Sequence, residues 1–378
     1  MSKVPKKASR KTVINRPETP PPSQPEFDEV LVLIDAAKVR ALAAANTALI
    51  DLYWSIGQHI STKIADEGWG QGTVAALAET IRRRYPTMRG FSARNLWRMM
   101  QFYETYRGQP KLAALLRELS WSHNLSIMSR CKRDEEREFY LRLAAREHWS
   151  FRELERQLAG ALFERVVLSP VKLSTPLAEL HPDAASVFKD SYLVEFLDLP
   201  PKHSEADLQR ALVEQLKQFL LELGRDFCFI GSQYPVQVGG RDFALDLLFF
   251  NRALNALVAF ELKVIEFEPE HLGKMQFYLE ALDRDVKKPH EQPSIGVLLC
   301  ATKNHEIVEY ALSRSMSPAL VAQYQTQLPD KKLLQAKLHE FYALAESQAD
   351  VDAQAEILPQ PAAQLPNAPK KRKVHKTS

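Results

Sequence analysis

Asp246-Leu-Leu-Phe-Phe-Asn-Arg-Ala-Leu-Asn-Ala-Leu-Val-Ala-Phe-Glu-Leu-Lys263 is the stretch that decides the fold. Two apolar runs, 243–250 and 256–262, flank a polar turn, a pattern that predicts a β-hairpin. Because strand side chains alternate between two faces, Glu261 and Lys263 share one face, while Phe260 and Leu262 point the other way into a core. Charges on so apolar a strand are costly to bury unless they are paired or bind a metal.

Carboxylates at Asp246 and Glu261, with a lysine two residues on, suit metal-assisted hydrolysis of a phosphodiester. Carboxylates can hold Mg²⁺ (or Mn²⁺), because Mg²⁺ is a hard ion that prefers oxygen ligands. The metal lowers the pKa of a bound water and neutralises charge on the phosphate. Lys263 can orient or deprotonate that water, or stabilise the transition state. The alternative is a buried Glu–Lys ion pair in an ordinary sheet, and the triplet alone does not decide between them.

Asp246 at the end of one strand and Glu261-Leu-Lys263 on the next resemble the motif of PD-(D/E)XK nucleases. The wider chain, roughly residues 30–345, resembles the YhcG-like family of bacterial nucleases. The phrases that carry this resemblance are FLLELG (219–224), FIGSQYP (229–235), DLLFF (246–250) and PSIGVLLC (293–300). One departure is that Leu245 stands where the motif has its proline.

The resemblance implies a Mg²⁺-dependent nuclease, a hydrolase of the endodeoxyribonuclease kind. Its substrate would be nucleic acid, DNA before RNA, in recombination, repair or defence. Asp246 and Glu261 would hold the metal, with the Leu262 carbonyl as a third ligand, and Lys263 would be catalytic. The alternative is a catalytically silent protein that binds nucleic acid as an adaptor, or as a subunit of a toxin or restriction-type complex.

Two weaker site candidates lie on predicted helices. An upstream acid often joins the metal site in PD-(D/E)XK enzymes, and Glu214 is the candidate in a helix predicted over 204–224. It projects away from the apolar stripe of that helix, which favours a surface position. Gln276 lies beside Lys274 and Tyr278 on a later helix, where some nucleases place a Gln or Lys on the scissile phosphate. A plain amphipathic helix explains these residues equally well.

The length predicts two domains. An all-α domain with a helix-turn-helix-like pattern is expected over 27–166, followed by a Pro-containing linker over 167–190. An α/β restriction-endonuclease-like domain with a mixed sheet is expected over 191–345. Residues 1–26 predict a disordered, basic, Pro-rich arm.

A disordered tail is expected over 346–378. It contains Pro369-Lys-Lys-Arg-Lys-Val374. That motif resembles a nuclear-localisation signal, and a phosphate-binding tail or an added tag are the alternatives.

Arginines concentrate in the expected helical domain, with no acidic residue between the first and the last of them. The cluster comprises Arg82, Arg83, Arg84, Arg89, Arg94 and Arg98. Arg94 and Arg98 share a face of the helix predicted over 93–106. These side chains are candidates for contacts with nucleic-acid phosphates, and a solvated basic face is the alternative.

Composition sets the remaining bounds. A net charge of +3 does not by itself predict nucleic-acid binding. No run approaches the ~18 apolar residues of a membrane span, and no apolar segment suggests a secretory signal. The three cysteines are far apart, which is typical of reduced thiols and not of structural zinc. We expect a cytoplasmic, nucleoid-associated bacterial protein, with a homo-oligomer left open.

Overall fold

The computed structural model describes residues 24–357, which form two compact units divided between Ala145 and Arg146. The expected arm begins and the expected tail ends outside this range, and the Pro369–Val374 motif also lies outside it. Helices reach further into both segments than predicted. The first helix already begins at Gln24, and the last continues to Ile357, two residues before Pro359. Its sequence beyond 345 is rich in Ala, Gln and Glu, which favour helices.

The first unit is helical, as predicted. Its elements are α1 (Gln24–Glu67), α2 (Gln71–Arg84), α3 (Ala93–Tyr106), η1 (Pro110–Leu112), α4 (Ala113–Glu118), α5 (Trp121–Arg130) and α6 (Asp134–Arg146). The Ser92 side chain caps α3 by accepting a hydrogen bond from the Asn95 N–H. Gly57 of α1 lets α3 approach closely, because a Cβ there would lie 2.1 Å from the Met99 carbonyl oxygen.

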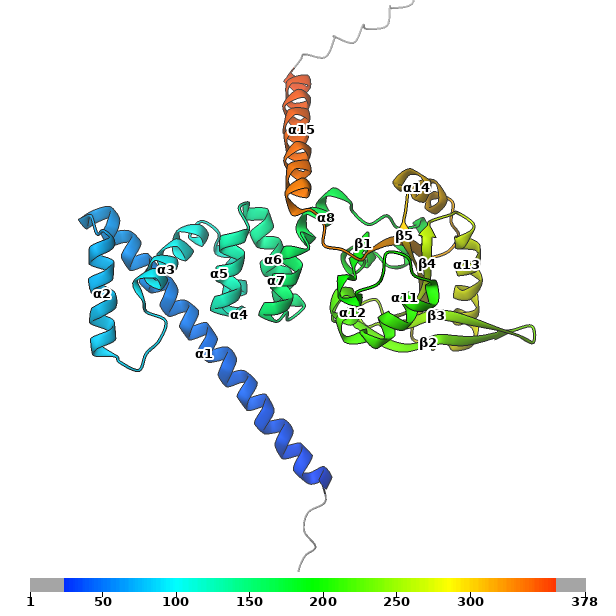
Figure 1. Cartoon of the computed structure of the whole chain (residues 1–378), viewed down its shortest axis with the longest axis horizontal. Helices are drawn as coiled ribbons and strands as arrows, with labels where there is room; N and C mark the ends of the chain where they lie inside the picture. Colours follow the sequence, from blue (N-terminus) through cyan, green and yellow to red (C-terminus); the bar gives the residue numbers. More distant parts are fainter. Residues whose placement is uncertain (1–23, 358–378) are drawn as a thin grey trace, which may run out of the picture. The chain divides into compact units, whose positions relative to one another are not determined.

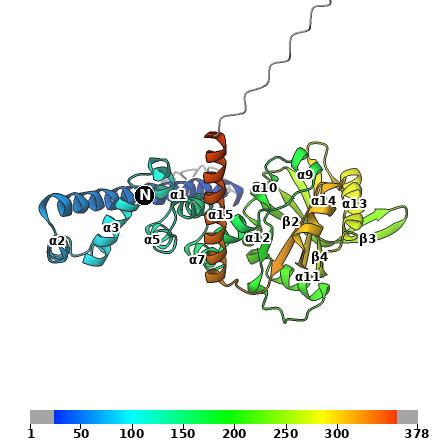
Figure 2. The ribbon, with the colours of Figure 1, turned by 90° about the horizontal axis from the view of Figure 1, so that it is seen from above.

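The second unit is built on a mixed six-stranded sheet in the order β1-β6-β5-β4-β3-β2 (Figures 1 and 2). The strands are β1 (Ser191–Leu193), β2 (Phe227–Val238), β3 (Arg241–Asn251), β4 (Ala256–Glu266), β5 (Gln292–Thr302) and β6 (Ala319–Gln325). β2, β3 and β4 pair antiparallel, whereas β4, β5, β6 and β1 pair parallel. The α/β prediction is confirmed. β6 is interior because β1 pairs with its outer side.

Helices cover both faces of this sheet. The helices of this unit are α7 (Phe151–Ala159), α8 (Leu162–Leu168), α9 (Thr175–Leu180), α10 (Ala184–Val187), α11 (Glu205–Glu214), α12 (Leu216–Leu223), α13 (His271–Ala281), α14 (His305–Ser313) and α15 (Lys331–Ile357), with the short 3-10 helix η2 (Glu195–Leu197) and the π-helix η3 (Leu282–Val286). Residues of α9 to α12 join the core on one face, and residues of α13 and α14 join the core on the other. The sheet is therefore apolar on both sides, as buried parallel strands require.

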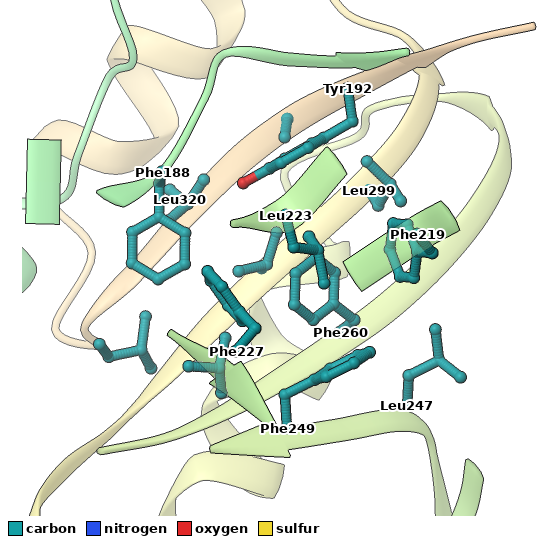
Figure 3. Close-up of a cluster of buried hydrophobic side chains, with 14 of the residues drawn as sticks. Phe188, Tyr192, Phe219, Leu223, Phe227, Leu247, Phe249, Phe260, Leu299 and Leu320 are labelled. Atoms are coloured by element: carbon teal, nitrogen blue, oxygen red, sulfur yellow. The ribbon is translucent and has the colours of Figure 1, made fainter. Parts of the chain in front are cut away.

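One of these cores is shown in Figure 3. Phe219 of α12 lies against Phe249 and Phe260 of the central hairpin, with ring centroids 5.9 and 6.1 Å away. Phe260 therefore points into the core, as the alternation of β4 predicts. The same packing holds the two strands that carry Asp246 and Glu261.

The segment 167–190 differs from the linker expected there. It contains α9 and α10, and the side chains of Leu177, Ala184 and Phe188 are buried in the core of the second unit. The prolines that suggested a linker include Pro176, which lies in the first turn of α9, where its missing N–H costs nothing. α7 and α8 belong to this second unit as well.

Candidate active site

The candidate site lies where β3 and β4 separate. Their antiparallel pairing ends at Leu247 and Phe260. Beyond this point a side chain joins the two strands: Oδ2 of Asp246 accepts a hydrogen bond from the Leu262 N–H at 2.8 Å. Asp246 is thereby fixed against the strand that carries Glu261.

Glu261 is buried, with 1% of its surface exposed, and its two carboxylate oxygens differ. Oε1 accepts hydrogen bonds from the ammonium groups of Lys263, at 3.1 Å, and Lys274. Oε2 is buried and accepts no hydrogen bond from any residue that the structure describes. Leaving a buried acceptor unpaired is costly, so this oxygen is an open position for a cation.

Lys274 reaches Glu261 because α13 packs closely on the sheet. Gly296 of β5 makes that approach possible, since a Cβ there would lie 2.5 Å from Cγ of Met275. Met275 and Tyr278 are buried, and the Tyr278 hydroxyl donates a hydrogen bond to the Ala244 carbonyl. The helix phase set by these contacts directs Lys274 to the carboxylate.

Lys263 joins three elements. Its Nζ lies 3.0 Å from the Leu262 carbonyl oxygen and 3.3 Å from both carboxylate oxygens of Glu205, the first residue of α11. Burial lowers the pKa of Lys263, but the charges of Glu261 and Glu205 more than offset this and raise it. Burial likewise lowers the pKa of Lys274, but the hydrogen bond to Glu261 and its negative charge more than offset this, so the pKa of Lys274 is also raised. Both side chains are therefore ammonium ions at neutral pH.

The pKa of Asp246 is raised, first by burial and then by the negative charge of Glu261. The hydrogen bond from the Leu262 N–H opposes that shift. Two carboxylates that repel one another in a partly buried site favour the binding of a cation between them.

Two glutamine amides complete the surroundings of Asp246. Gln209 of α11 donates to the Asp246 backbone carbonyl at 2.7 Å, and Gln233 of β2 donates to the Gln209 side chain at 2.9 Å. The Gln233 amide also lies 3.4 Å from Asp246 Oδ1. Gln233 has a φ of 46°, a conformation that is uncommon outside glycine and that often marks a functional site.

The donor set fits a hard divalent cation. Asp246, Glu261 and the Leu262 carbonyl offer oxygen atoms only, and one of these oxygens, Glu261 Oε2, lacks a partner. In the described part of the chain, no cluster of three or more His, Cys, Asp or Glu side chains is arranged to hold a metal. A metal here would thus depend on two carboxylates, the carbonyl and water.

The structure brings together Asp246, Glu261, Leu262 and Lys263, but not the two weaker candidates. Glu214 ends α11 and is exposed, as its position away from the apolar stripe of the helix favoured. The helix expected over 204–224 breaks one residue further on, at Gln215. The upstream acid beside the site is Glu205 instead. Gln276 is exposed on α13, and Lys274 takes the position beside the carboxylate.

The sequence alone did not predict a role for Glu205, Gln209 or Gln233. Glu205 follows the N-cap residue Ser204, where an acidic side chain is common for electrostatic reasons alone. The two glutamines carry no charge and match no motif. Only the fold shows that these residues lie beside Asp246 and Lys263.

The arginine cluster lies in the first unit, on α2, on α3 and in the turn between them. Arg82 pairs with Glu79, an acidic residue that precedes the cluster on α2. Among described residues, Arg83, Arg84, Arg94 and Arg98 form no salt bridge, and neither does Arg89. The position of Arg82, Arg83 and Arg84 in the last turn of α2 also suits the helix dipole.

Comparison with known proteins matches both halves of the chain. Residues 29–165 match the "DUF1016 N-terminal domain" and residues 185–339 the "YhcG PDDEXK nuclease domain". "Putative nuclease YhcG" of Escherichia coli (strain K12) is 32% identical over 359 residues, covering 84% of this chain and 94% of the relative. The chain belongs to the YhcG family of PDDEXK nucleases. The resemblance stated from the sequence is confirmed.

Solved structures also overlap part of the chain. A repair endonuclease from Pyrococcus abyssi and the EndoMS–dsDNA2 complex each align with 35% of this chain, at 15% identity and a TM-score of 0.23. The chain spans about half of those proteins, 50% and 48% respectively. At this level the alignments add no argument on function. Within the described residues, no helix is long and apolar enough to cross a membrane.

Proposed function

We propose that this YhcG-family protein hydrolyses phosphodiester bonds in nucleic acid, with DNA as the substrate and Mg²⁺ or Mn²⁺ as the cofactor. The observation that carries the proposal is the open Oε2 of buried Glu261, beside Asp246 and two ammonium groups. A nuclease of this family that binds a cation at this oxygen would act in recombination, repair or defence. A DNA substrate would place the protein with the bacterial nucleoid.

Asp246 and Glu261 would hold the metal, together with the Leu262 carbonyl. When bound, the metal supplies an acidic water and charge neutralisation at the phosphate. Asp246 is oriented for this by the Leu262 N–H, and Gln233 lies near its other oxygen. Glu205 holds the Lys263 ammonium group beside Glu261.

Lys263 acts as a donor and a positive charge. Its raised pKa keeps the side chain protonated, so stabilising charge on a phosphate oxygen suits it better than removing a proton from water. Lys274 is about half exposed and carries a second positive charge toward solvent, where a phosphate would approach. The unpaired arginines of α2 and α3 are proposed to contact phosphates further along the nucleic acid.

A second candidate function is a nucleic-acid adaptor without catalysis. The observation in its favour is that Lys263 and Lys274 together neutralise Glu261 without a metal. In that case the cluster stabilises the fold and the site does not cut.

The test is a cleavage assay of wild type and Glu261→Gln on linear, circular, branched and single-stranded DNA, and on RNA. Each substrate is incubated with Mg²⁺, with Mn²⁺ and with a chelator, and binding is measured in parallel by fluorescence anisotropy. We expect metal-dependent cleavage of at least one DNA substrate that the chelator and Glu261→Gln both abolish, while binding persists. Binding without cleavage of any substrate, unaffected by metal, would contradict the proposal and support the adaptor.

A further inference from the structure

The first half of α1 has no cover within the first unit. The helix has 44 residues, yet Ile50 is its first buried residue among those described. Figure 1 shows this half, in dark blue, running on beyond the helices that pack against the other half. Large apolar side chains are exposed along it: Phe27 by 50%, Val30 by 53% and Ile34 by 44%. An exposed apolar stripe of this length marks an interaction surface.

The stripe has the spacing of a coiled coil. Positions three and four residues apart alternate without a break, and every one of them is apolar and exposed: Phe27, Val30, Ile34, Ala37, Ala41, Ala44 and Ala48. We call this set the α1 seam. Three heptads of this pattern favour pairing with another helix. Apolar residues spaced 3.5 residues apart on average stay on the side of the helix that faces the partner.

The order of residues along the seam favours an antiparallel partner of the same sequence. Its first half is bulky and its second half is alanine, so antiparallel copies pack large residues against small ones. Asp28 and Glu29 flank the bulky end, and Lys38 and Arg40 lie about three turns further on. A parallel pair would oppose the two acidic residues to their own copies. Lys38 also pairs with Asp35 of its own helix at 3.3 Å, an exposed contact that solvent weakens.

We propose that residues 27–44 form an antiparallel coiled coil with a second copy of this chain. In the register that opposes the bulky residues to alanines, Phe27 packs against Ala44 of the other copy. Val30 packs against its Ala41, and Ile34 against its Ala37. This register also brings Asp28 and Glu29 of one helix within about one turn of Arg40 of the other. The pairing does not depend on the nuclease proposal.

The first test is the mass of the full-length protein in solution, by light scattering over a range of concentrations. The chain mass is 43.0 kDa, so the expected dimer has about twice this mass. Ile34→Glu places a charge in the seam and should yield the monomer. Val39→Glu is the matched control, because Val39 is 66% exposed but lies outside the seam, and it should remain dimeric. A monomeric wild type would mean that its own chain or another protein covers the seam, and would overturn the proposal. A dimer that Ile34→Glu leaves intact would do the same.

The second test reads the direction of the helices. Phe27→Cys and Ala44→Cys variants, each with the exposed Cys228 changed to Ser, are mixed and oxidised. The antiparallel register brings positions 27 and 44 of different copies within disulfide range, and separates the two copies of position 27 by about 25 Å. We expect a cross-linked dimer from the mixture and none from Phe27→Cys alone. Efficient cross-linking of Phe27→Cys with itself would show a parallel pair and overturn the proposed arrangement.

Discussion

Glu222 and Glu261 are both buried glutamates of the second unit, but their oxygens are satisfied differently. Oε1 of Glu222 accepts hydrogen bonds from Lys189 Nζ at 3.2 Å and the Leu193 N–H at 3.1 Å. Its Oε2 accepts from Arg156 and from the Gln157 amide. Every bond joins elements of the fold, so Glu222 is held as a structural carboxylate.

Glu261 has donors on one oxygen only. Both of its lysines crowd Oε1, and Oε2 is left buried without a donor. A glutamate kept only for stability would be expected to resemble Glu222, with both oxygens paired. The difference argues that Glu261 is kept for a cation.

The largest effect is expected from Glu261→Gln and Asp246→Asn. Each change removes a charged oxygen ligand, and hard divalent ions depend on ligand charge. Cleavage should fall to background, while DNA affinity stays within a few fold and the melting temperature changes little. Rates with Mg²⁺, anisotropy and thermal melts on the same samples check this. Full activity of either variant at ordinary Mg²⁺ would remove that residue from the metal site.

Glu222→Gln should do the reverse. It leaves Arg156 and Lys189 buried beside a neutral amide, and breaking a buried pair costs about 3–5 kcal/mol of unfolding free energy. The cationic neighbours overcome the cost of burial and lower the pKa of Glu222 to about 2. Its stabilising contribution is therefore complete above the ordinary value of 4.5 and is lost as the pH falls toward 2. Urea unfolding at pH 7 and pH 3 measures both effects. A variant as stable as wild type at pH 7 would break the comparison.

Lys263→Ala separates catalysis from packing. A positioned charge acting on a developing anion is worth about 10²–10³ in rate. Cleavage should fall by that factor, with metal binding retained. Stability should change little, because Lys274 still pairs with Glu261. A large drop in melting temperature, in a protein whose wild type cuts nothing, would instead support the adaptor.

Several features of this site followed from the sequence. The period-2 alternation placed Glu261 and Lys263 on one face, and Phe260 and Leu262 on the other. The apolar runs gave the hairpin and the mixed sheet. These features depend on local geometry, which residue patterns report directly.

Other features depend on packing between distant segments. The helix expected over 204–224 breaks at Gln215, and Glu205 alone of the acidic residues of α11 reaches Lys263. The choice of Lys274 over Gln276 depends on how closely α13 meets Gly296. Neither the helix break nor that approach has a signal within its own segment.

The arginines of the first unit also divide into paired and unpaired side chains, and the smallest effect on DNA binding is expected from changing them. Each phosphate contact contributes about −0.9 to the log–log dependence of DNA affinity on salt. Changing Arg94 and Arg98 together to Ala should reduce the magnitude of that slope by up to about 2. Arg82→Ala is the control, because Arg82 already pairs with Glu79. An unchanged slope in the double variant would mean that these arginines form a solvated face.

The central claim is that the open oxygen of Glu261 binds a divalent cation. Binding of Mn²⁺ to the full-length protein, followed by loss of the free-ion signal in electron paramagnetic resonance, tests it without relying on cleavage. We predict saturable Mn²⁺ binding that Mg²⁺ competes away, that Asp246→Asn and Glu261→Gln abolish, and that Lys263→Ala retains. Wild-type protein that binds no Mn²⁺ at millimolar concentrations, or carboxylate variants that bind it as wild type does, would contradict the account.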